Sequence, residues 1–327
     1  MFHDEGQRSS WLVGATCGGL LMMITAGCAL TTDSVSGPAV QATATSAGAQ
    51  VNQDSDLSAC PETEWFWFRD PSLAHPIRIA CSIPPDPQGA GVLVVMPGAQ
   101  RNASDYLADW LESSLARSTI VLVPELPRDQ FSEDTYNLGG VVDEDGEDTE
   151  QSTWTYGFIE RLFAQVVEAS GSNAATYDLF GHSAGAQFVH RFVELDLHPH
   201  LGTAIAANAG WYLLPDDDQS FPYGLHGIPP DEDDLSNAFQ SRLVVLLGAD
   251  DVDEEGDLVR HDSGADEQGL NRLDRGLSFF SQARETADNR GFEFAWSMVV
   301  VPGVAHDHSL MSRAAASLLS PSSPIGE

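Results

Sequence analysis

The sequence predicts an α/β domain in which helices flank a mostly parallel central sheet, with an antiparallel hairpin at its N-terminal edge. Continuous apolar, β-branched runs such as 91–96 are typical of strands that are covered on both faces. These runs alternate along the chain with amphipathic stretches such as 154–169, whose apolar residues recur at helical spacing. Strands that alternate with helices indicate a layered α/β fold.

The expected elements follow one another from residue 64 to residue 319. The opening hairpin is expected from two strands at 64–69 and 77–83. The other strands are expected at 91–96, 119–123 (ended by Pro124), 177–180, 203–207, 243–247 and 292–301. The helices are expected at 104–117, 154–169, 184–195, 270–288 and 309–319.

Two longer inserts, 125–151 and 211–240, interrupt this alternation. Both leave from the carboxyl ends of strands, which is where open α/β sheets bind their ligands. They are therefore candidates for the walls of a substrate cleft. The acidic run at 143–148 within the first insert is interpreted as a solvated loop.

The charge balance excludes whole classes of function. The chain of 327 residues has 15 Lys+Arg, all of them Arg, against 49 Asp+Glu, for a formal net charge of -34. Such a surface repels nucleic acids and disfavours binding to anionic lipid headgroups. The hydrophobic fraction of 42% and the aromatic fraction of 9% are too high for a disordered acidic chain.

The N-terminal segment is predicted to be a targeting signal. Residues 11–26 are apolar and uncharged over the length of a signal h-region. They end in Thr25-Ala26-Gly27-Cys28, which resembles a bacterial lipoprotein signal at 1–28 with Cys28 as the lipidated residue. Alternatives are an ordinary secretory peptide or an uncleaved anchor. The protein is expected to be exported and to meet a membrane only through this N-terminal lipid.

Small and polar residues dominate 29–58, which predicts a flexible linker before a folded domain at 59–327. Within that domain Cys60 and Cys81 lie at the outer ends of the predicted hairpin. Because disulfides persist in exported proteins, a Cys60–Cys81 bridge is predicted. The alternative is a pair of buried free thiols.

The motif Gly181-His182-Ser183-Ala184-Gly185 lies between a predicted strand and a predicted helix, the context that G-x-S-x-G requires. So tight a turn forces the serine into strained dihedral angles, and a side chain two residues before or after it would collide. The following helix aligns its N-terminal amides and its dipole with a developing oxyanion. The motif predicts Ser183 as a nucleophile.

The chain resembles the α/β-hydrolase superfamily, and within it the exported esterases and polyhydroxyalkanoate-depolymerase-like members, over about 59–319. Its most specific features are the motif at 181–185, Pro97-Gly98-Ala99-Gln100-Arg101-Asn102, and Asn208-Ala209-Gly210-Trp211-Tyr212.

In this superfamily the catalytic residues follow one another as serine, acid and histidine. The resemblance implies Asp251 as the acid, after Gly248-Ala249-Asp250, with Asp250 and Asp253 as alternatives. It implies His306 rather than His308 as the base, after the turn Pro302-Gly303-Val304-Ala305. A neutral imidazole accepts the serine proton, while a carboxylate on its other nitrogen fixes the tautomer.

The oxyanion hole is expected from the backbone N–H groups of Ala184 and Ala99. Relatives commonly carry His-Gly where this chain has Pro97-Gly98, a change that leaves backbone donation from Ala99 possible. Arg101, Trp211 and Tyr212 are candidates for substrate binding. Arg101 alternatively orders or caps the next helix, and the two aromatic residues alternatively belong to the core.

These features predict an exported serine hydrolase of the carboxylesterase type, working through an acyl-enzyme on a small-molecule or oligomeric ester. It is expected to be a monomer without a cofactor. No metal site is predicted, because the calcium-loop-like run at 251–262 lacks flanking helices and the final glutamate. Alternatives are an amidase or peptidase of the same fold, or a catalytically silent surface lipoprotein with a binding role.

Overall fold

The computed structural model describes residue 57, residue 60 and residues 64–143, 145–195, 198–228, 230–256 and 258–319. The predicted signal with Cys28 and all of the predicted linker except Leu57 lie outside these residues. No helix among the described residues has the length and hydropathy needed to cross a membrane.

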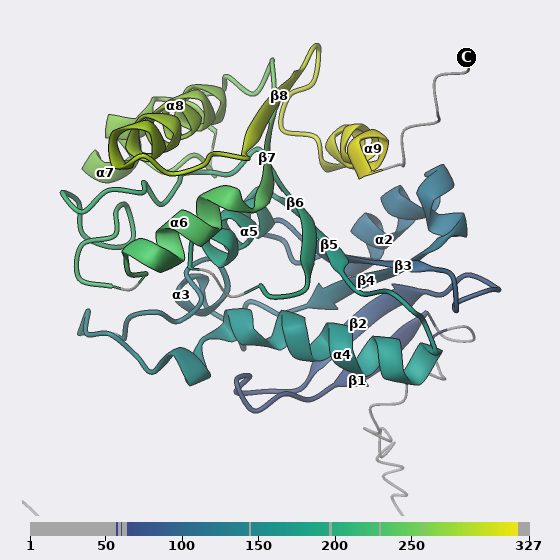
Figure 1. Ribbon diagram of the computed structural model, residues 1–327. Helices are drawn as coiled ribbons and strands as arrows, with labels where there is room; N and C mark the ends of the chain where they lie inside the picture. Colours follow the sequence, from purple (N-terminus) through teal and green to yellow (C-terminus); the bar gives the residue numbers. More distant parts are fainter. Residues whose placement is uncertain are drawn as a thin grey trace, which may run out of the picture. The chain divides into compact units, whose positions relative to one another are not determined.

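One sheet of eight strands runs through the described domain, in the order β1-β2-β4-β3-β5-β6-β7-β8 (Figure 1). Its strands are β1 (Trp65–Phe68), β2 (Ile77–Ser82), β3 (Gly91–Met96), β4 (Thr119–Glu125), β5 (Tyr177–His182), β6 (Leu201–Ala207), β7 (Arg242–Gly248) and β8 (Ser297–Val301). The pairs β1–β2 and β2–β4 are antiparallel, and all other pairs are parallel. The predicted α/β architecture with an antiparallel N-terminal hairpin is confirmed.

Helices cover both faces of this sheet (Figure 1). On one face lie α2 (Ala103–Leu111) and α9 (His308–Leu319); on the other lie α4 (Phe158–Ser170), α5 (Ala184–Glu194), α6 (Glu232–Gln240) and α8 (Arg272–Arg290). Shorter segments are α3 (Glu133–Tyr136), α7 (Ser263–Gln268) and the 3₁₀ turns η2 (Ser114–Arg117), η3 (Gln151–Thr153) and η4 (Thr155–Gly157).

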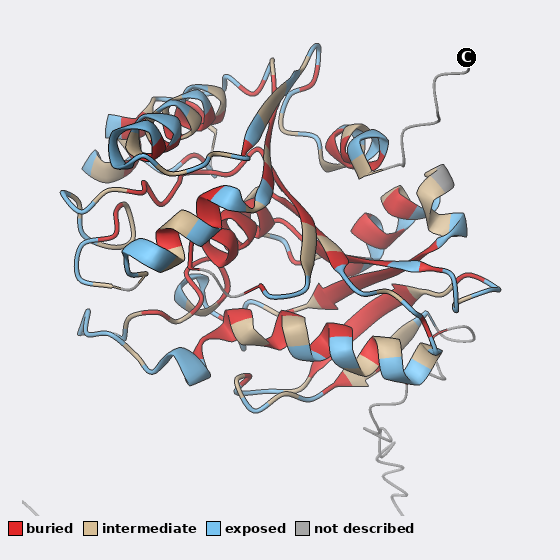
Figure 2. Ribbon diagram, in the orientation of Figure 1, coloured by how far each residue is buried: buried red, intermediate tan, exposed pale blue. Residues whose placement is uncertain are grey.

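The strand side chains alternate between two hydrophobic clusters. In β3, Val94 and Met96 pack into the cluster beneath α4 and α5, whereas Leu93 and Val95 pack beneath α2 and α9. All four side chains are buried, and Figure 2 shows the same burial along the central strands. A strand covered on both faces has no polar face, which is why the strand runs read as continuously apolar.

Two predicted boundaries are wrong for local reasons. Strand β4 continues through Pro124, which lies opposite Ile79 of β2. Pairing of β4 with β3 on the other side ends at Leu122, so the missing N–H of proline leaves no gap in that ladder. Helix α2 stops at Leu111, because Ser113 is extended and its hydroxyl donates to the carbonyl of Trp110.

The segment before β8 is also not a strand. The predicted strand at 292–301 is confirmed only for Ser297–Val301. The aromatic residues Phe292, Phe294 and Trp296 pack instead around Phe239 of α6. Their apolar pattern therefore reflects packing against a helix that sequence patterning did not reveal within the insert 211–240.

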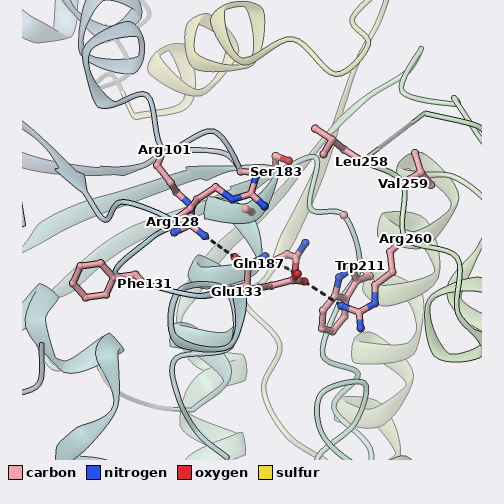
Figure 3. A pocket seen from close by; sticks show the side chains of 14 residues that line it. Arg101, Arg128, Phe131, Glu133, Ser183, Gln187, Trp211, Leu258, Val259 and Arg260 are labelled. Atoms are coloured by element: carbon pink, nitrogen blue, oxygen red, sulfur yellow. Dashed lines mark hydrogen bonds and ion pairs between the residues drawn. The ribbon is translucent and has the colours of Figure 1, made fainter. Parts of the chain in front are cut away.

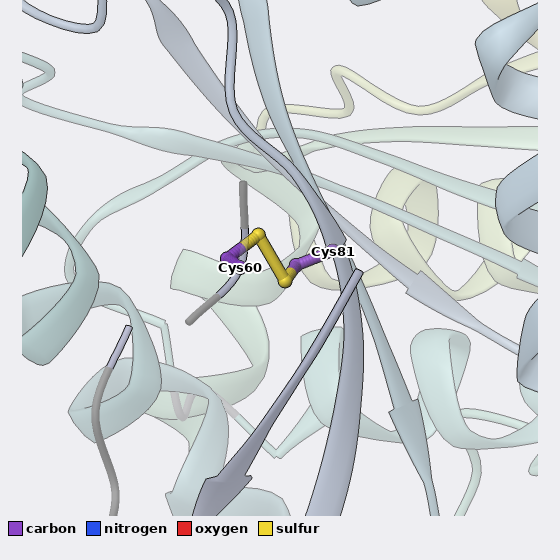
Figure 4. The surroundings of a disulfide bond; sticks show 2 residues. All are labelled: Cys60 and Cys81. Carbon is purple, nitrogen blue, oxygen red and sulfur yellow. A yellow bond between two sulfur atoms is a disulfide. The ribbon is translucent and has the colours of Figure 1, made fainter. Parts of the chain in front are cut away.

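The predicted disulfide is confirmed. Cys60 and Cys81 are bonded, with Cα atoms 5.9 Å apart (Figure 4). The bridge fastens the segment before β1 to β2, and the amide of Cys81 also donates to the carbonyl of Glu64. Both cysteines are buried.

Candidate active site

The turn from β5 into α5 carries Ser183 in a strained conformation. Its φ is 57° and its ψ is -116°, which places a non-glycine residue in a sparsely populated region. A Cβ at Gly181 would lie 2.2 Å from the carbonyl oxygen of Gly185, and one at Gly185 would lie 2.0 Å from that of Met96. Only glycine allows this close approach of backbone to backbone. The turn presents Ser183 at the carboxyl edge of the sheet.

Asp251 and His306 form a close pair beside this turn. The Nδ1 atom of His306 lies 2.7 Å from Oδ2 of Asp251, whose side chain is buried. This contact puts the proton of neutral His306 on Nδ1 and leaves Nε2 as the free acceptor. Ser183 and His306 line the same cavity of about 200 Å³, although no hydrogen bond joins them among the described residues. The alternatives Asp250 and Asp253 are both exposed.

The second carboxylate oxygen of Asp251 faces Arg272, the first residue of α8. Arg272 Nη1 lies 3.4 Å from Oδ1, and both side chains are buried. The backbone carbonyl of Asp251 also accepts from the amide of Leu273. A buried carboxylate with partners on both oxygens stays fixed toward His306.

Asn208, at the end of β6, joins the loops that carry the acid and the histidine. Its Oδ1 accepts from the amide of Gly248 at 2.7 Å, and its Nδ2 donates to the carbonyl of Ala305 at 3.1 Å. Gly248 precedes Asp251 by three residues, and Ala305 directly precedes His306. One buried side chain thus fixes the spacing of two loops that are far apart in sequence.

The loop after β3 is held at a single peptide unit. The carbonyl of Pro97 accepts from the hydroxyl of Tyr136 at 2.7 Å, and the amide of Gly98 donates to the hydroxyl of Tyr106 at 3.0 Å. Both tyrosines are buried, one in α3 and one in α2. This clamp fixes the Pro97–Gly98 peptide, which precedes the peptide that carries the N–H of Ala99.

The amides of Ala99 and Ala184 remain available. Among the described residues neither N–H has a protein acceptor, and both residues line a cavity together with Ser183. Two unpaired donors beside a nucleophile are what a developing oxyanion requires.

Three histidines gather on the other side of this loop. Since the hydroxyl of Tyr106 accepts from Gly98, its own proton goes to Nδ1 of His182 at 3.0 Å. The rings of His182 and His306 lie 4.6 Å apart, and His308 stacks on Tyr106. Burial, followed by the nearby His306, His308 and Arg272, lowers the pKa of His182 well below its ordinary value of 6.5. His182 is therefore neutral, and its role is to position Tyr106.

A larger cavity of about 470 Å³ opens from Ser183 (Figure 3). Arg101 and Trp211, two of the predicted substrate-binding residues, line it. Tyr212 does not. It is fully buried and stacks on Phe279 in the core, with ring centroids 4.5 Å apart. Residues of the first insert form part of the wall, whereas the second insert contributes little beyond Trp211.

Sequence reasoning missed several residues that shape this site. Tyr106 lies on the apolar face of a helix, where its hydroxyl carries no pattern signal, and Tyr136 lies in an insert expected to be a loop. Asn208 belongs to a segment that supports the family resemblance, but the resemblance assigned it no role in the site. Arg128 and Gln187 also line the cavity. The only signal for Arg128 in the sequence was that an arginine occurs within an acid-rich insert.

No family model matches the chain, and neither does any curated protein. Among solved structures, poly(aspartic acid) hydrolase-1 from Sphingomonas sp. KT-1 is 37% identical, with a TM-score of 0.75 over 78% of this chain and 97% of that one. LpqC, a poly(3-hydroxybutyrate) depolymerase from Bordetella parapertussis, is 30% identical, with a TM-score of 0.72 over 78% and 88%. FphF, a fluorophosphonate-binding serine hydrolase of Staphylococcus aureus, shares the fold at 12% identity and a TM-score of 0.51 over 78% and 95%.

The fold and these relatives define the class of protein, a hydrolase built on a mostly parallel sheet with a strained serine turn after β5. The chain belongs to the α/β-hydrolase superfamily, as the motifs at 97–102, 181–185 and 208–212 predict.

Proposed function

We propose that the protein is a serine hydrolase that cleaves carboxylic acyl bonds through a covalent intermediate on Ser183. The observation that carries the proposal is the hydrogen bond between buried Asp251 and partly exposed His306, which lines the same cavity as Ser183. That geometry supplies a nucleophile, a base and an orienting carboxylate in one place.

In the first half of the reaction, Ser183 Oγ attacks the carbonyl carbon and gives its proton to Nε2 of His306. The negative charge moves to the carbonyl oxygen, where the N–H groups of Ala99 and Ala184 stabilise it. His306 then returns the proton to the leaving oxygen or nitrogen, which departs as an alcohol or amine. The acyl group stays on Ser183.

In the second half, a water molecule gives a proton to His306 and attacks the acyl carbon. The tetrahedral intermediate collapses, Ser183 recovers its proton from His306, and a carboxylic acid leaves. Asp251 remains ionised throughout and stabilises the imidazolium that forms twice. No atom outside the chain, the substrate and water takes part in these steps.

The bond we propose is a carboxylic ester. The relative LpqC is named as a depolymerase of a polyester, which supports an oligomeric ester substrate. The test is a panel of p-nitrophenyl esters of graded acyl length, together with labelling by a fluorophosphonate probe. Wild type should turn over the esters and become labelled, and Ser183→Ala should do neither. Ser113→Ala, at a serine outside the site, is the matched control.

A second candidate is amide hydrolysis. The relative that is 37% identical is named as a hydrolase of poly(aspartic acid), a polyamide. Incubation with oligo(aspartic acid), followed by measurement of newly formed amines, compares this activity with ester turnover. Amine release that is lost in Ser183→Ala would favour the amide, and ester turnover without amine release would favour the ester.

We also propose that the protein is exported and carries a lipid at Cys28. The apolar segment at 11–26 and the disulfide Cys60–Cys81 support this, since disulfides persist outside the cytosol. Expression in a bacterium followed by fractionation tests it. Wild type should sediment with membranes and Cys28→Ser should not. Recovery of both in the cytosolic fraction contradicts the proposal.

A further inference from the structure

We propose that the substrate cleaved at Ser183 carries a carboxylate, and that Arg101 and Arg128 bind it on the wall of the cavity. The inference rests on the proposed function and names the chemical class of its substrate. The residues concerned line the same cavity as Ser183 and Ala184 (Figure 3).

Cations are scarce in this chain, which has 15 of them against 49 acidic residues. Nearly half of the arginines are therefore neutralised within the structure. Those with a carboxylate partner among the described residues are Arg78, Arg161, Arg260, Arg272, Arg275, Arg290 and Arg313. Arg101 and Arg128 have none, although the chain has more than three acidic residues for each arginine.

Arg101 is a buried cation without a counter-ion. It is 6% exposed, and its Nε has no hydrogen-bond partner. Its other nitrogens reach only the carbonyl of Leu126 at 3.4 Å and the amide oxygen of Asn137 at 3.5 Å, both long contacts. The guanidinium lies over the ring of Tyr136, 3.3 Å from its centroid. The groups in contact with this guanidinium are thus neutral. The carboxylate of Glu133 acts favourably on its charge without direct contact, and that carboxylate is itself paired with Arg260.

Arg128 adds a second uncompensated charge nearby. It is exposed and makes no hydrogen bond or ion pair among the described residues. Burial lowers the pKa of Arg101 to about 10, and the positive charge of Arg128 acts in the same direction. Arg101 remains cationic at neutral pH, so an anion that binds between it and Arg128 relieves the repulsion between the two side chains.

The opposite wall of the cavity has an arginine as well, but its positive charge is already paired. Figure 3 shows Arg101 and Arg128 near Ser183, with Arg260 across the cavity beside Trp211. Arg260 pairs with Glu133 at 3.1 Å and with Asp262 at 2.6 Å, so its charge is already matched. The unmatched positive charge is therefore on one side only. A planar guanidinium binds carboxylate through paired hydrogen bonds, which makes a carboxylate the fitting ligand.

The experiment compares two p-nitrophenyl esters of equal acyl length, the hexanoate and the monoester of adipic acid. The adipate differs by one terminal carboxylate. For wild type we expect kcat/KM for the adipate to exceed that for the hexanoate by about tenfold at low salt, with the ratio falling at 0.5 M NaCl. Arg128→Gln should lower the ratio about tenfold.

Arg117→Gln is the matched control, since Arg117 is also exposed and makes no hydrogen bond or ion pair among the described residues, but it lies outside the cavity. It removes the same charge from the protein and should leave the ratio unchanged. Oligo(aspartic acid) added as a competitor of hexanoate hydrolysis distinguishes the source of the carboxylate. Competition far stronger than that of adipate identifies an oligomeric acid, and equal competition identifies a small one.

The inference is overturned if wild type hydrolyses the hexanoate but prefers it to the adipate, or if Arg128→Gln leaves the ratio as it is. Absence of turnover with both esters, together with no fluorophosphonate labelling of Ser183, overturns the proposed function as well. The labelling therefore separates the two failures.

Discussion

Two segments meet at the candidate nucleophile, the turn Gly181–Gly185 between β5 and α5, and the loop Pro97–Asn102 between β3 and α2. The turn depends on its own glycines, because an added Cβ would lie 2.2 Å from a backbone oxygen at Gly181 and 2.0 Å from one at Gly185. The loop is fixed by residues outside it, because the hydroxyls of Tyr106 and Tyr136 hold one of its peptides. One half of the site is therefore specified locally and the other by tertiary contacts.

The largest expected effect on stability comes from a substitution in the locally specified turn. In Gly185→Ala, the new Cβ would meet the backbone carbonyl of Met96, which has no freedom to move within β3. We expect a loss of about 3 kcal/mol in the free energy of unfolding and of at least ~100-fold in kcat. Gly89→Ala is the control, because nothing lies within 4 Å of its added Cβ. Denaturant unfolding and ester turnover measure both. Equal behaviour of the two variants contradicts the steric account.

The largest expected effect on kcat concerns Asp251, which lies in a third loop of the site. Asp251→Asn keeps the shape of the side chain but favours the wrong tautomer of His306, so kcat should fall about 10⁴-fold with little change in KM. Asp250→Asn, at the exposed neighbouring acid, should stay within about twofold of wild type. Steady-state kinetics on one p-nitrophenyl ester suffices. A larger loss in Asp250→Asn would reassign the acid.

A smaller effect is expected from removing the hydrogen bonds that hold the loop Pro97–Asn102. Tyr136→Phe and Tyr106→Phe each remove one hydroxyl from the Pro97–Gly98 peptide and should lower kcat about tenfold while KM changes less than about twofold. Tyr177→Phe is the control, since its hydroxyl bonds Glu160 away from the site and should affect stability alone. If all three variants lose kcat equally, the loop does not depend on the clamp.

The smallest effect concerns His182, which belongs to the turn but touches the loop through Tyr106. Because its pKa lies well below 6.5, the unfolded chain binds a proton below pH 6.5 that the folded chain does not. The free energy of unfolding should therefore decrease as the pH falls below 6.5, by about 1.4 kcal/mol per pH unit from this residue.

His182→Gln removes this contribution, so the variant should lose about 1 kcal/mol less than wild type between pH 7 and pH 5.5. Urea unfolding at the two pH values measures the difference. The exposed His226→Gln serves as the control. An identical pH dependence in wild type and His182→Gln would show that folding does not lower the pKa of this histidine.

The comparison also explains which parts of the site could be predicted. The strained turn at Ser183 and the positions of the strands along the chain could be predicted because glycine spacing and apolar runs are local signals. The choice of Asp251 over Asp250 needed a family resemblance, since nothing in the run Gly248–Asp253 distinguishes the two. The structure distinguishes them by burial, because only Asp251 lies inside, against His306 and Arg272.

Other features had no local signal at all. The hydroxyl of Tyr106 was hidden on an apolar helix face, and helix α6 was hidden in an acidic insert despite its capping box at Asp231 and Asp234. The location of Tyr212 in the core rather than the cavity depends on its stacking with Phe279, which is 67 residues away in sequence. Such contacts are set by the folded arrangement of α8 against β7.

By itself the sequence determined the layered sheet, the strained serine turn and the acidic surface, because backbone sterics, periodicity and charge act within a few residues or over the whole composition. The tertiary structure alone decided how the loop at Ala99 is held and which aspartate faces His306. It also decided that Arg101 and Arg128, which have no ion-pair partner in the described part of the chain, line the cavity of Ser183. These depend on distances between segments far apart in the chain, and only packing fixes such distances.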